Sequence, residues 1–423
     1  MPLPGVRSRR RRLAFVAGTV LIVLLITEGL ARLGLYLSEG TNWQSDQLLL
    51  ANQGLEREDY RQIPHPYVGI ITPPTLDTDH VDDALFVNVL GFPLRTPPVQ
   101  KCRSDRLLVG IVGGSVARHF ATYGGRRLRE QLTKSPLIAG RNVDVICLAN
   151  EGFKQPQQLM AVNYSLSLGG EFDIVVNLDG FNELVVADGN YQVEANTAYP
   201  RSWRFATAKD EWWNSSRGVF QMRRLQRERR ELADDARLSP WRFLALRQLW
   251  WRIRDIRLRD QFRLAAQESS RSRADSNPAR DFGVLGPREK FASDEELLSR
   301  LTSLWEDSSR QLQHLAAGER FLFLHCLQPT ALLEESKSLS RREQTIVGET
   351  EMRQKELVRA GYPQLRTSAV RLAAHGEQFR DLTNVFADVT ETVYVDACHL
   401  NQRGNDLLAE RIAQEILDAW PGK

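Results

Sequence analysis

Residues 106–115 read Arg-Leu-Leu-Val-Gly-Ile-Val-Gly-Gly-Ser, an apolar run that ends in two glycines and a serine. A short apolar run bounded by turn residues is typical of a strand buried on both faces. Similar runs follow at 143–148, 173–178 and 320–327. Helical patterns lie between them, notably at 126–132 and 157–168. Strands that alternate with helices predict an α/β fold with a mostly parallel sheet covered on both faces.

The composition suits a globular protein. The chain has 423 residues, of which 42% are hydrophobic, and this is ample for one large core or two smaller ones. Its 56 basic and 53 acidic residues leave a net charge of only +3. A dedicated nucleic-acid binder usually concentrates a stronger positive excess on one face, so no nucleic-acid partner is predicted. The oligomeric state stays open.

The cysteines and histidines give no metal-binding pattern. No two cysteines form a Cys-x-x-Cys unit, and no two of the seven histidines have the spacing of zinc ligands. We therefore predict neither a metal nor another cofactor. Cys147 and Cys326 lie in apolar runs, where free buried thiols are expected. A disulfide is the alternative if the domain lies outside the cytoplasm.

The N-terminal segment has the pattern of a membrane anchor. Arginines dominate residues 7–12, and the apolar stretch from Leu13 to Leu37 is long enough to cross a bilayer. We predict an uncleaved transmembrane helix with residues 1–12 as a basic cytoplasmic tail. The protein is then a single-pass membrane protein whose remaining domain is periplasmic or extracellular.

Two alternatives to the anchor are a cleaved signal peptide and a buried helix of a soluble protein. Glu28 and Arg32 fall where a signal peptide needs a cleavage site between small residues, and no Ala-x-Ala follows. Because they are four residues apart, they can instead pair on one helix face near the membrane interface. An arginine cluster also rarely precedes a buried helix.

The remaining chain divides by composition. We predict a proline-rich stalk and lead-in segment, a first part of the α/β domain, a helical insertion with a flexible loop, and a second part of the domain. These parts cover residues 38–100, 101–199, 200–318 with the loop at about 268–290, and 319–423. Seven of the nine tryptophans and many arginines lie at 200–318. They could stack on sugars, lie at a lipid headgroup surface, or simply pack a helical cap.

Three strand-end segments carry groups that suit acyl chemistry. Ser115 follows the first strand, where its hydroxyl and backbone N–H lie above the carboxyl edge of the sheet. Gly152 follows the second strand and lets the backbone N–H approach a substrate. Asn182 follows the third strand, and its amide can donate to a developing oxyanion. Taken singly, each also fits a structural turn or a helix cap.

The fourth segment is Asp396-Ala-Cys-His399, which precedes a helix expected from Gly404. An aspartate three residues before a histidine can reach its Nδ1–H within one turn. It would then fix the tautomer and stabilise the imidazolium when the histidine takes a proton. This pair is more specific than the three other segments.

The four segments together resemble the signature blocks of the SGNH (GDSL-like) hydrolase family, in which Ser, Gly, Asn and His follow in this order. The resemblance covers about 106–183 and 320–418, and it implies a flavodoxin-like three-layer α/β/α sandwich. Two positions depart from the family. Gly114 replaces the acid of Gly-Asp-Ser, and Glu183 replaces the second acid of Gly-x-Asn-Asp. The Gly-Gly-Ser block is similar to that of anchored members associated with bacterial cell-surface polysaccharides.

The resemblance assigns a role to each residue of the site. It implies that Ser115 is the nucleophile, that His399 is its base, and that Asp396 orients the base. The backbone N–H groups of Ser115 and Gly152 and the Asn182 side chain would form the oxyanion hole.

The implied reaction is hydrolysis of a carboxylic ester through an acyl-enzyme. The expected substrate is an acylated glycan or lipid outside the cytoplasm, and we expect Lys154, Gln155 and His119 to border or contact it. Two alternatives stay open. One is acyl transfer to a cell-surface polysaccharide by the same residues, which differs in the exclusion of water. The other is a catalytically silent scaffold.

Overall fold

The computed structural model describes most of the chain. The described residues are 4–39, 63–75, 86–138, 140–201, 203, scattered positions between 221 and 236, 239–271 and 286–420. The predicted stalk and the predicted loop at 268–290 therefore lie partly outside the described residues. The chain forms two compact units, Met1–Tyr60 with Lys209–Ser276, and Arg61–Ala208 with Asn277–Lys423. The predicted insertion overlaps both units.

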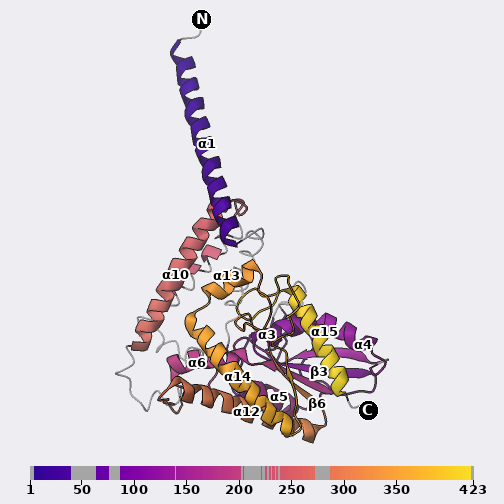
Figure 1. Cartoon of the computed structure of the whole chain (residues 1–423). Helices are drawn as coiled ribbons and strands as arrows, with labels where there is room; N and C mark the ends of the chain where they lie inside the picture. The colour runs from indigo at the N-terminus through magenta and orange to yellow at the C-terminus, as the bar shows by residue number, and fades with distance from the viewer. Residues whose placement is uncertain are drawn as a thin grey trace. The chain divides into compact units, whose positions relative to one another are not determined.

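The larger unit contains a five-stranded parallel sheet in the order β4-β3-β5-β6-β7 (Figure 1). Its strands are β3 (Arg106–Gly113), β4 (Asn142–Cys147), β5 (Ile174–Asp179), β6 (Leu322–Leu327) and β7 (Gln378–Asp381). The four predicted strands and the parallel α/β class are confirmed. The sequence did not predict β7, because Gln-Phe-Arg-Asp is too polar to read as a buried strand.

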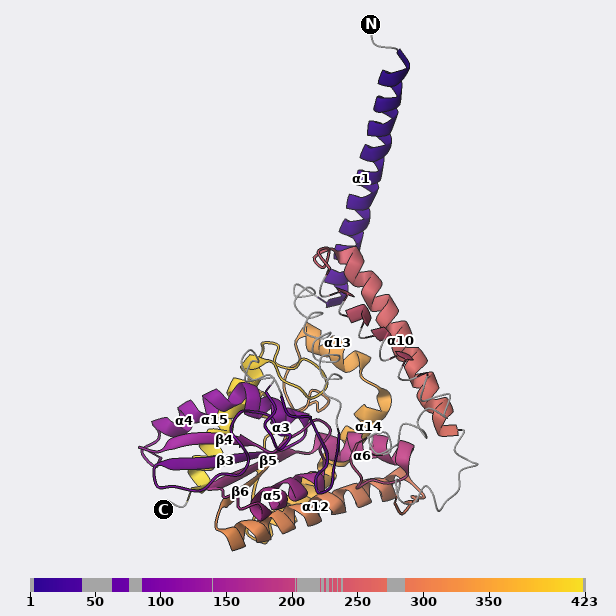
Figure 2. The same cartoon turned by 180° about the vertical axis from the view of Figure 1, so that it is seen from behind.

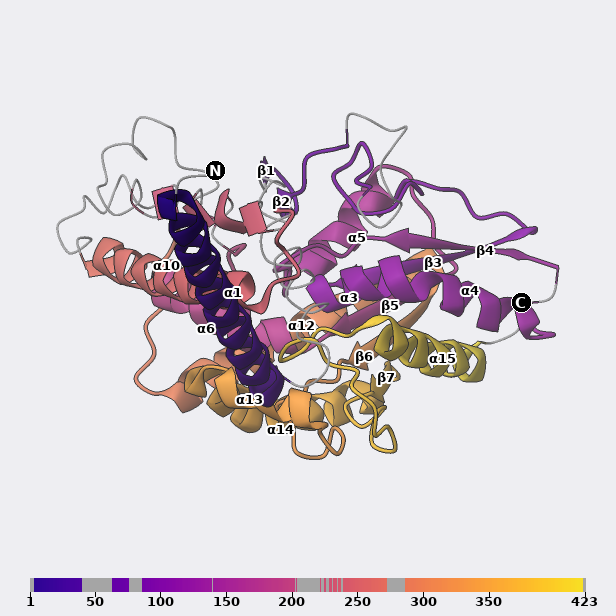
Figure 3. The same cartoon turned by 90° about the horizontal axis from the view of Figure 1, so that it is seen from above.

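Helices cover both faces of this sheet. The helices that the structure describes in the larger unit include α3 (Ser115–His119), the π-helix η2 (Phe120–Gly124), α4 (Gly125–Lys134), α5 (Gln157–Ser167), α6 (Phe181–Glu194), α12 (Asp294–Glu319), α13 (Arg341–Glu349), α14 (Met352–Ala374) and α15 (Gln402–Ala419). Figures 2 and 3 show α4 and α15 on one side of the strands and α5 on the other.

The side chains of β3 explain the two layers. Leu107, Val109 and Ile111 point into a core shared with α4 and α15. Leu108 and Val112 point into a second core with α5 and the end of α12. Because successive strand residues face opposite sides, this continuously apolar run can be buried on both faces.

Smaller features complete this unit. The antiparallel pair β1 (Ile63–His65) and β2 (Gly69–Ile71) adds Ile70 and Ile71 to the second core. Cys147 and Cys326 are fully buried and free, as predicted. Burial raises the pKa of the Cys147 thiol to about 12, so this thiol stays protonated at neutral pH.

The smaller unit contains two long helices, α1 (Pro4–Glu39) and α10 (Ala245–Arg271). The stretch Ala14–Leu37 of α1 is long and apolar enough to cross a membrane. The predicted pair within it forms, with Arg32 Nε 2.8 Å from Glu28 Oε1.

Candidate active site

Ser115 stands at the carboxyl end of β3, where the chain turns sharply into α3. Gly113 has φ +146°, and a Cβ on it would come within 2.2 Å of the Leu178 carbonyl oxygen. Only glycine fits this turn without displacing β5. The turn makes Ser115 the first residue of α3, with 6% of its surface exposed.

His399 reaches Ser115 from the loop between β7 and α15. Its Nε2 lies 2.7 Å from Ser115 Oγ, and its Nδ1 lies 2.7 Å from Asp396 Oδ2. The other Asp396 oxygen, Oδ1, accepts the backbone N–H groups of Cys398 and His399 at 2.9 and 2.8 Å. These local bonds fix the carboxylate within one turn of the histidine. The local pair of Asp396 and His399 thus forms one hydrogen-bonded chain with Ser115, which is 284 residues from His399 in the sequence.

Within this hydrogen-bonded chain, His399 and Asp396 each stabilise the charged form of the other. Burial would lower the pKa of the His399 imidazole, but the Asp396 carboxylate raises it well above its usual value. Burial would raise the pKa of the Asp396 carboxyl, but the charge and hydrogen bonds of His399 hold it below its usual range. The Asp396 side chain is 45% exposed, so water screens part of this attraction. A proton taken from Ser115 would therefore be well stabilised on His399.

Gly152 lies on the loop that follows β4, and Asn182 lies in the first turn of α6, directly after β5. Gly152 has φ +72°, and a Cβ on it would come within 2.7 Å of Arg201 Cδ. The Asn182 amide nitrogen donates to the Phe153 carbonyl oxygen at 2.8 Å. An amide nitrogen carries two hydrogens, so the second stays available for another acceptor. The Asn182–Phe153 bond also joins the start of α6 to the loop after β4.

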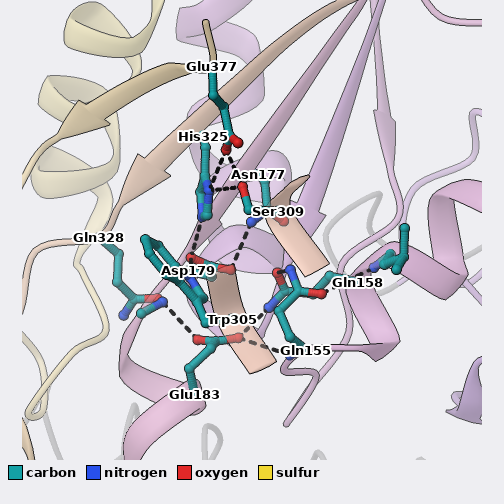
Figure 4. Close-up of polar contacts among 12 residues, drawn as sticks. Gln155, Gln158, Asn177, Asp179, Glu183, Trp305, Ser309, His325, Gln328 and Glu377 are labelled. Carbon is teal, nitrogen blue, oxygen red and sulfur yellow. Dashed lines mark hydrogen bonds and ion pairs between the residues drawn. The ribbon is translucent and has the colours of Figure 1, made fainter. Parts of the chain in front are cut away.

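A second connection between the loop after β4 and the start of α6 is the buried carboxyl of Glu183 (Figure 4). Its Oε1 accepts the Gln155 backbone N–H at 3.2 Å and the Gln158 side-chain amide at 2.7 Å. Its Oε2 accepts the Gly180 backbone N–H at 2.8 Å. Burial and the nearby Asp179 carboxylate raise the pKa of Glu183 to about 8. One side chain therefore holds the backbone just before Asn182, at Gly180, and just after Gly152, at Gln155.

Behind this connection lies a buried polar network, also visible in Figure 4. Asp179 Oδ1 accepts from Trp305 Nε1 at 2.8 Å and lies 2.9 Å from His325 Nε2. His325 Nδ1 lies 2.6 Å from Ser309 Oγ and 3.3 Å from Glu377 Oε1. Burial would lower the pKa of His325, but Asp179 and Glu377 raise it to about 9. A charged imidazole thus stabilises Asp179 at the end of β5.

The sequence did not predict this network. Its members come from β5, α12, β6 and the segment before β7, and no spacing in the chain connects them. Trp305 was grouped with the insertion, but it is fully buried in the core of the larger unit. The one available signal was the run Asp179-Gly-Phe-Asn-Glu183, in which two acids flank the asparagine.

The three predicted substrate contacts occupy different positions. His119 is 5% exposed, and its ring lies 4.8 Å from the His399 ring, measured between centroids. Lys154 is fully buried, and its Nζ donates to the carbonyl oxygens of Thr197 and Tyr199 at 2.5 and 2.8 Å. Gln155 is buried as well. His119 is therefore beside the hydrogen-bonded chain, whereas the Lys154 ammonium holds the 197–199 backbone.

Two charged residues that the sequence did not single out flank His119. Arg118 NH1 lies 3.5 Å from Glu151 Oε1, and His119 Nε2 lies 3.9 Å from the same oxygen. Arg118 is 6% exposed. Since Glu151 immediately precedes Gly152, this cluster places a carboxylate and a guanidinium next to the loop after β4.

Among the described residues, one group could hold a metal ion. Ligand atoms of Asp396, Cys398 and His399 lie within 4.8 Å of one another. Asp396 Oδ2 and His399 Nδ1 are already hydrogen-bonded to each other, and a metal on Nδ1 would have to break that bond. These groups therefore fit the hydrogen-bonded chain to Ser115 better than they fit a metal centre.

Comparisons with known proteins add little. No family model matches the chain, and no curated protein matches it. Among solved structures, a crystal structure of an acetyl xylan esterase is similar over 74% of this chain and all of its own, with a TM-score of 0.34 and 11% identity. A likeness at this level does not by itself establish a shared activity.

Proposed function

We propose that this chain is a serine hydrolase of carboxylic esters. The observation that carries the proposal is the continuous hydrogen-bonded chain from Ser115 Oγ through His399 to Asp396. A serine hydroxyl is a weak nucleophile until a base takes its proton, and an imidazole held by a carboxylate is a suitable base. The serine also stands at the carboxyl edge of a parallel sheet, where open α/β folds bind ligands.

The reaction follows from the positions of these groups. Ser115 Oγ attacks the ester carbonyl while His399 Nε2 takes its proton. The carbonyl oxygen becomes an oxyanion that accepts from the backbone N–H groups of Ser115 and Gly152 and from Asn182 Nδ2. His399 then returns the proton to the departing alcohol, and an acyl-serine forms. Water, deprotonated by His399, attacks this ester; the bond from the acyl carbon to Ser115 Oγ then breaks, Oγ takes the proton back from His399, and the acid is released.

We infer further that the chain is a divergent member of the SGNH type. Ser115, Gly152 and Asn182 each follow one of three adjacent strands, and His399 precedes the last helix, in the order of that family. The Asp-x-x-His pair supports the same inference through its contacts. We also propose that α1 anchors the protein, with its arginine-rich end in the cytoplasm. The substrate is then an acylated glycan or lipid outside the cytoplasm.

Covalent labelling tests the proposal. The full-length protein in detergent is treated with a fluorophosphonate probe and, separately, with short-chain aryl esters. We expect labelling at Ser115 and ester turnover, and we expect Ser115→Ala and His399→Gln to lose both. Equal turnover in wild type and Ser115→Ala, without labelling, contradicts the proposal. The product distribution with an acceptor glycan present separates hydrolysis from acyl transfer, since transfer places the acyl group on the glycan rather than releasing the acid.

A further inference from the structure

Two charged residues of the apolar helix α1 hold a turn of the smaller unit. Glu28 Oε1 accepts from the Ala245 backbone N–H at 2.8 Å, and Glu28 Oε2 accepts from that of Leu246 at 3.1 Å. Arg32 pairs with Glu28 at 2.8 Å and donates to the Phe243 carbonyl oxygen at 3.5 Å. Because Ala245 begins α10, Glu28 supplies acceptors that the first N–H groups of a helix otherwise lack.

This contact lies within the membrane-spanning stretch. At 1.5 Å per residue, about 20 residues cross a hydrocarbon core of roughly 30 Å. Counted from Ala14, the core ends near Leu33, so Glu28 and Arg32 lie close to its outer boundary. On this part of α1, Ala31 packs against Ala245, whereas Leu33 is 53% exposed. Exposed apolar side chains of α1 therefore surround the contact, and in water they would be unfavourably solvated.

The turn itself presents aromatic side chains. Trp241 is 60% exposed and Phe243 is 53% exposed, although both belong to the residue types that proteins usually bury. Aromatic residues gather at the boundary between lipid and water. Backbone groups at that depth must find acceptors within the protein, and Glu28 provides them here.

The first half of α10 continues this surface. Leu249, Ile253 and Ile256 are 37, 44 and 49% exposed, and their spacing of four and three residues aligns them on one helix face. The side chains of Trp251, Asp255 and Leu258 are buried instead. Helix α10 thus has a packed face and a separate, uncovered apolar face.

Arginines border the uncovered face. The Trp250 ring, 43% exposed, has the guanidinium of Arg247 at 5.4 Å and that of Arg254 at 5.2 Å from its centroid. Apolar and aromatic side chains flanked by arginine are the composition of helices that lie in a membrane interface and attract anionic headgroups.

We propose that Trp241–Ile256 is a second membrane-binding element, which inserts into the outer boundary of a bilayer beside α1 and is held at that depth by Glu28. The occupant of the uncovered face is lipid with anionic headgroups. The placement of the charged pair within the span, the exposed aromatic turn and the arginine border each support this assignment. The proposal requires that α1 spans the membrane, and it is independent of the ester chemistry.

Spin labels on the full-length protein test this element. The protein is reconstituted in vesicles of phosphatidylcholine with a minority of phosphatidylglycerol, on a Cys102→Ser background. Trp241→Cys and Phe243→Cys carry the labels, with Leu21→Cys as the control in the span and Val89→Cys as the control in water. We expect the label at 241 to be reached by oxygen several-fold more than by a polar nickel complex, as at Leu21, and the reverse at Val89.

Three results would overturn the proposal. Labels at 241 and 243 that behave like the one at Val89 place the turn in water. Labels shielded from both reagents indicate a protein partner, which includes a second copy of the chain. A polar environment at Leu21 removes the span itself. The role of Glu28 is tested separately, since Glu28→Ala should move the label at 241 toward water while Leu21 stays in lipid. An unchanged label at 241 in that variant contradicts the role of Glu28.

Discussion

The amide nitrogen of Asn182 lies directly against Gly114, such that a Cβ added to Gly114 would come within 2.1 Å of it and within 2.9 Å of the Phe153 carbonyl oxygen. The residue that precedes the proposed nucleophile is therefore fitted to a proposed oxyanion donor. A side chain at position 114 would collide with Asn182. This contact accounts for the glycine at the position where the family that the sequence resembles has an acid.

The first prediction concerns this contact. Gly114→Ala should displace the Asn182 amide and break its hydrogen bond to the Phe153 carbonyl oxygen. We expect kcat to fall by about 10²- to 10³-fold, the scale of losing one oxyanion donor. Gly189→Ala is the matched control, since it lies on the same helix as Asn182 with open space around it. Steady-state aryl ester hydrolysis measures both. Equal kcat in the two variants would exclude Asn182 from the oxyanion hole.

A second prediction concerns the pH dependence of turnover. Catalysis requires neutral His399, and Asp396 raises the pKa of that imidazole, so activity should increase with pH through a value above 6.5. Asp396→Asn should lower kcat by roughly 10⁴-fold and move the acidic limb of the kcat/KM profile to lower pH. Asp388→Asn, an exposed change on the same loop, should leave the profile unchanged. An unmoved limb in Asp396→Asn would separate Asp396 from the base.

Glu183 gives a third prediction, because it holds the segment after β4 to the start of α6. Glu183→Ala should lower kcat by about 10²-fold, the effect of misplacing reacting groups by roughly 1 Å. Glu183→Gln keeps one acceptor oxygen and should restore part of the loss. Glu377→Ala is the control, since it removes a buried carboxyl from the same network without touching either segment. Equal losses of kcat in the two folded alanine variants would contradict a specific role of Glu183 in positioning the site.

The fourth prediction is that thermal stability decreases between pH 6.5 and 9. The pKa of His325 is raised to about 9, so its contribution is complete below its unfolded value of 6.5 and is lost as pH rises through 9. The pKa of Glu183 is raised from 4.5 to about 8, which favours the protonated folded state and acts in the same direction. Calorimetry measures the slope of Tm against pH. Glu183→Gln should reduce this slope below pH 8, and a Tm that rises over this range would contradict the assignment.

The fifth prediction separates support from substrate binding at Lys154. Lys154→Ala removes the donor to two carbonyl oxygens and should cost about 1–3 kcal/mol for each acceptor left unpaired. Denaturant unfolding measures this loss, and KM for a small aryl ester should stay unchanged because the ammonium faces the 197–199 backbone. A higher KM with unchanged stability would instead support the predicted substrate contact.

Residue types and their spacing were enough to predict the local elements of this protein. The apolar runs at 106–112, 143–148 and 173–178 are buried on both faces. Their burial could be predicted because nearly every residue in each run is apolar. The pairing of Asp396 with the histidine three positions later is also local, because one turn of chain brings them together. The apolar length of α1 and the pairing of Glu28 with Arg32 follow in the same way from helix periodicity.

Which distant residues share a hydrogen bond depends instead on how the elements pack in three dimensions. The polar strand β7 forms because β6 offers it a free edge, and Trp305 belongs to the larger core because α12 packs there. The placement of His325 between Asp179 and Glu377, and of Glu28 against the start of α10, depends on contacts across long stretches of chain. Buried polar groups must form hydrogen bonds. The segment that provides the partner is set by tertiary packing and cannot be read from the local sequence. Ser115 and His399, 284 residues apart, come within 2.7 Å for this reason.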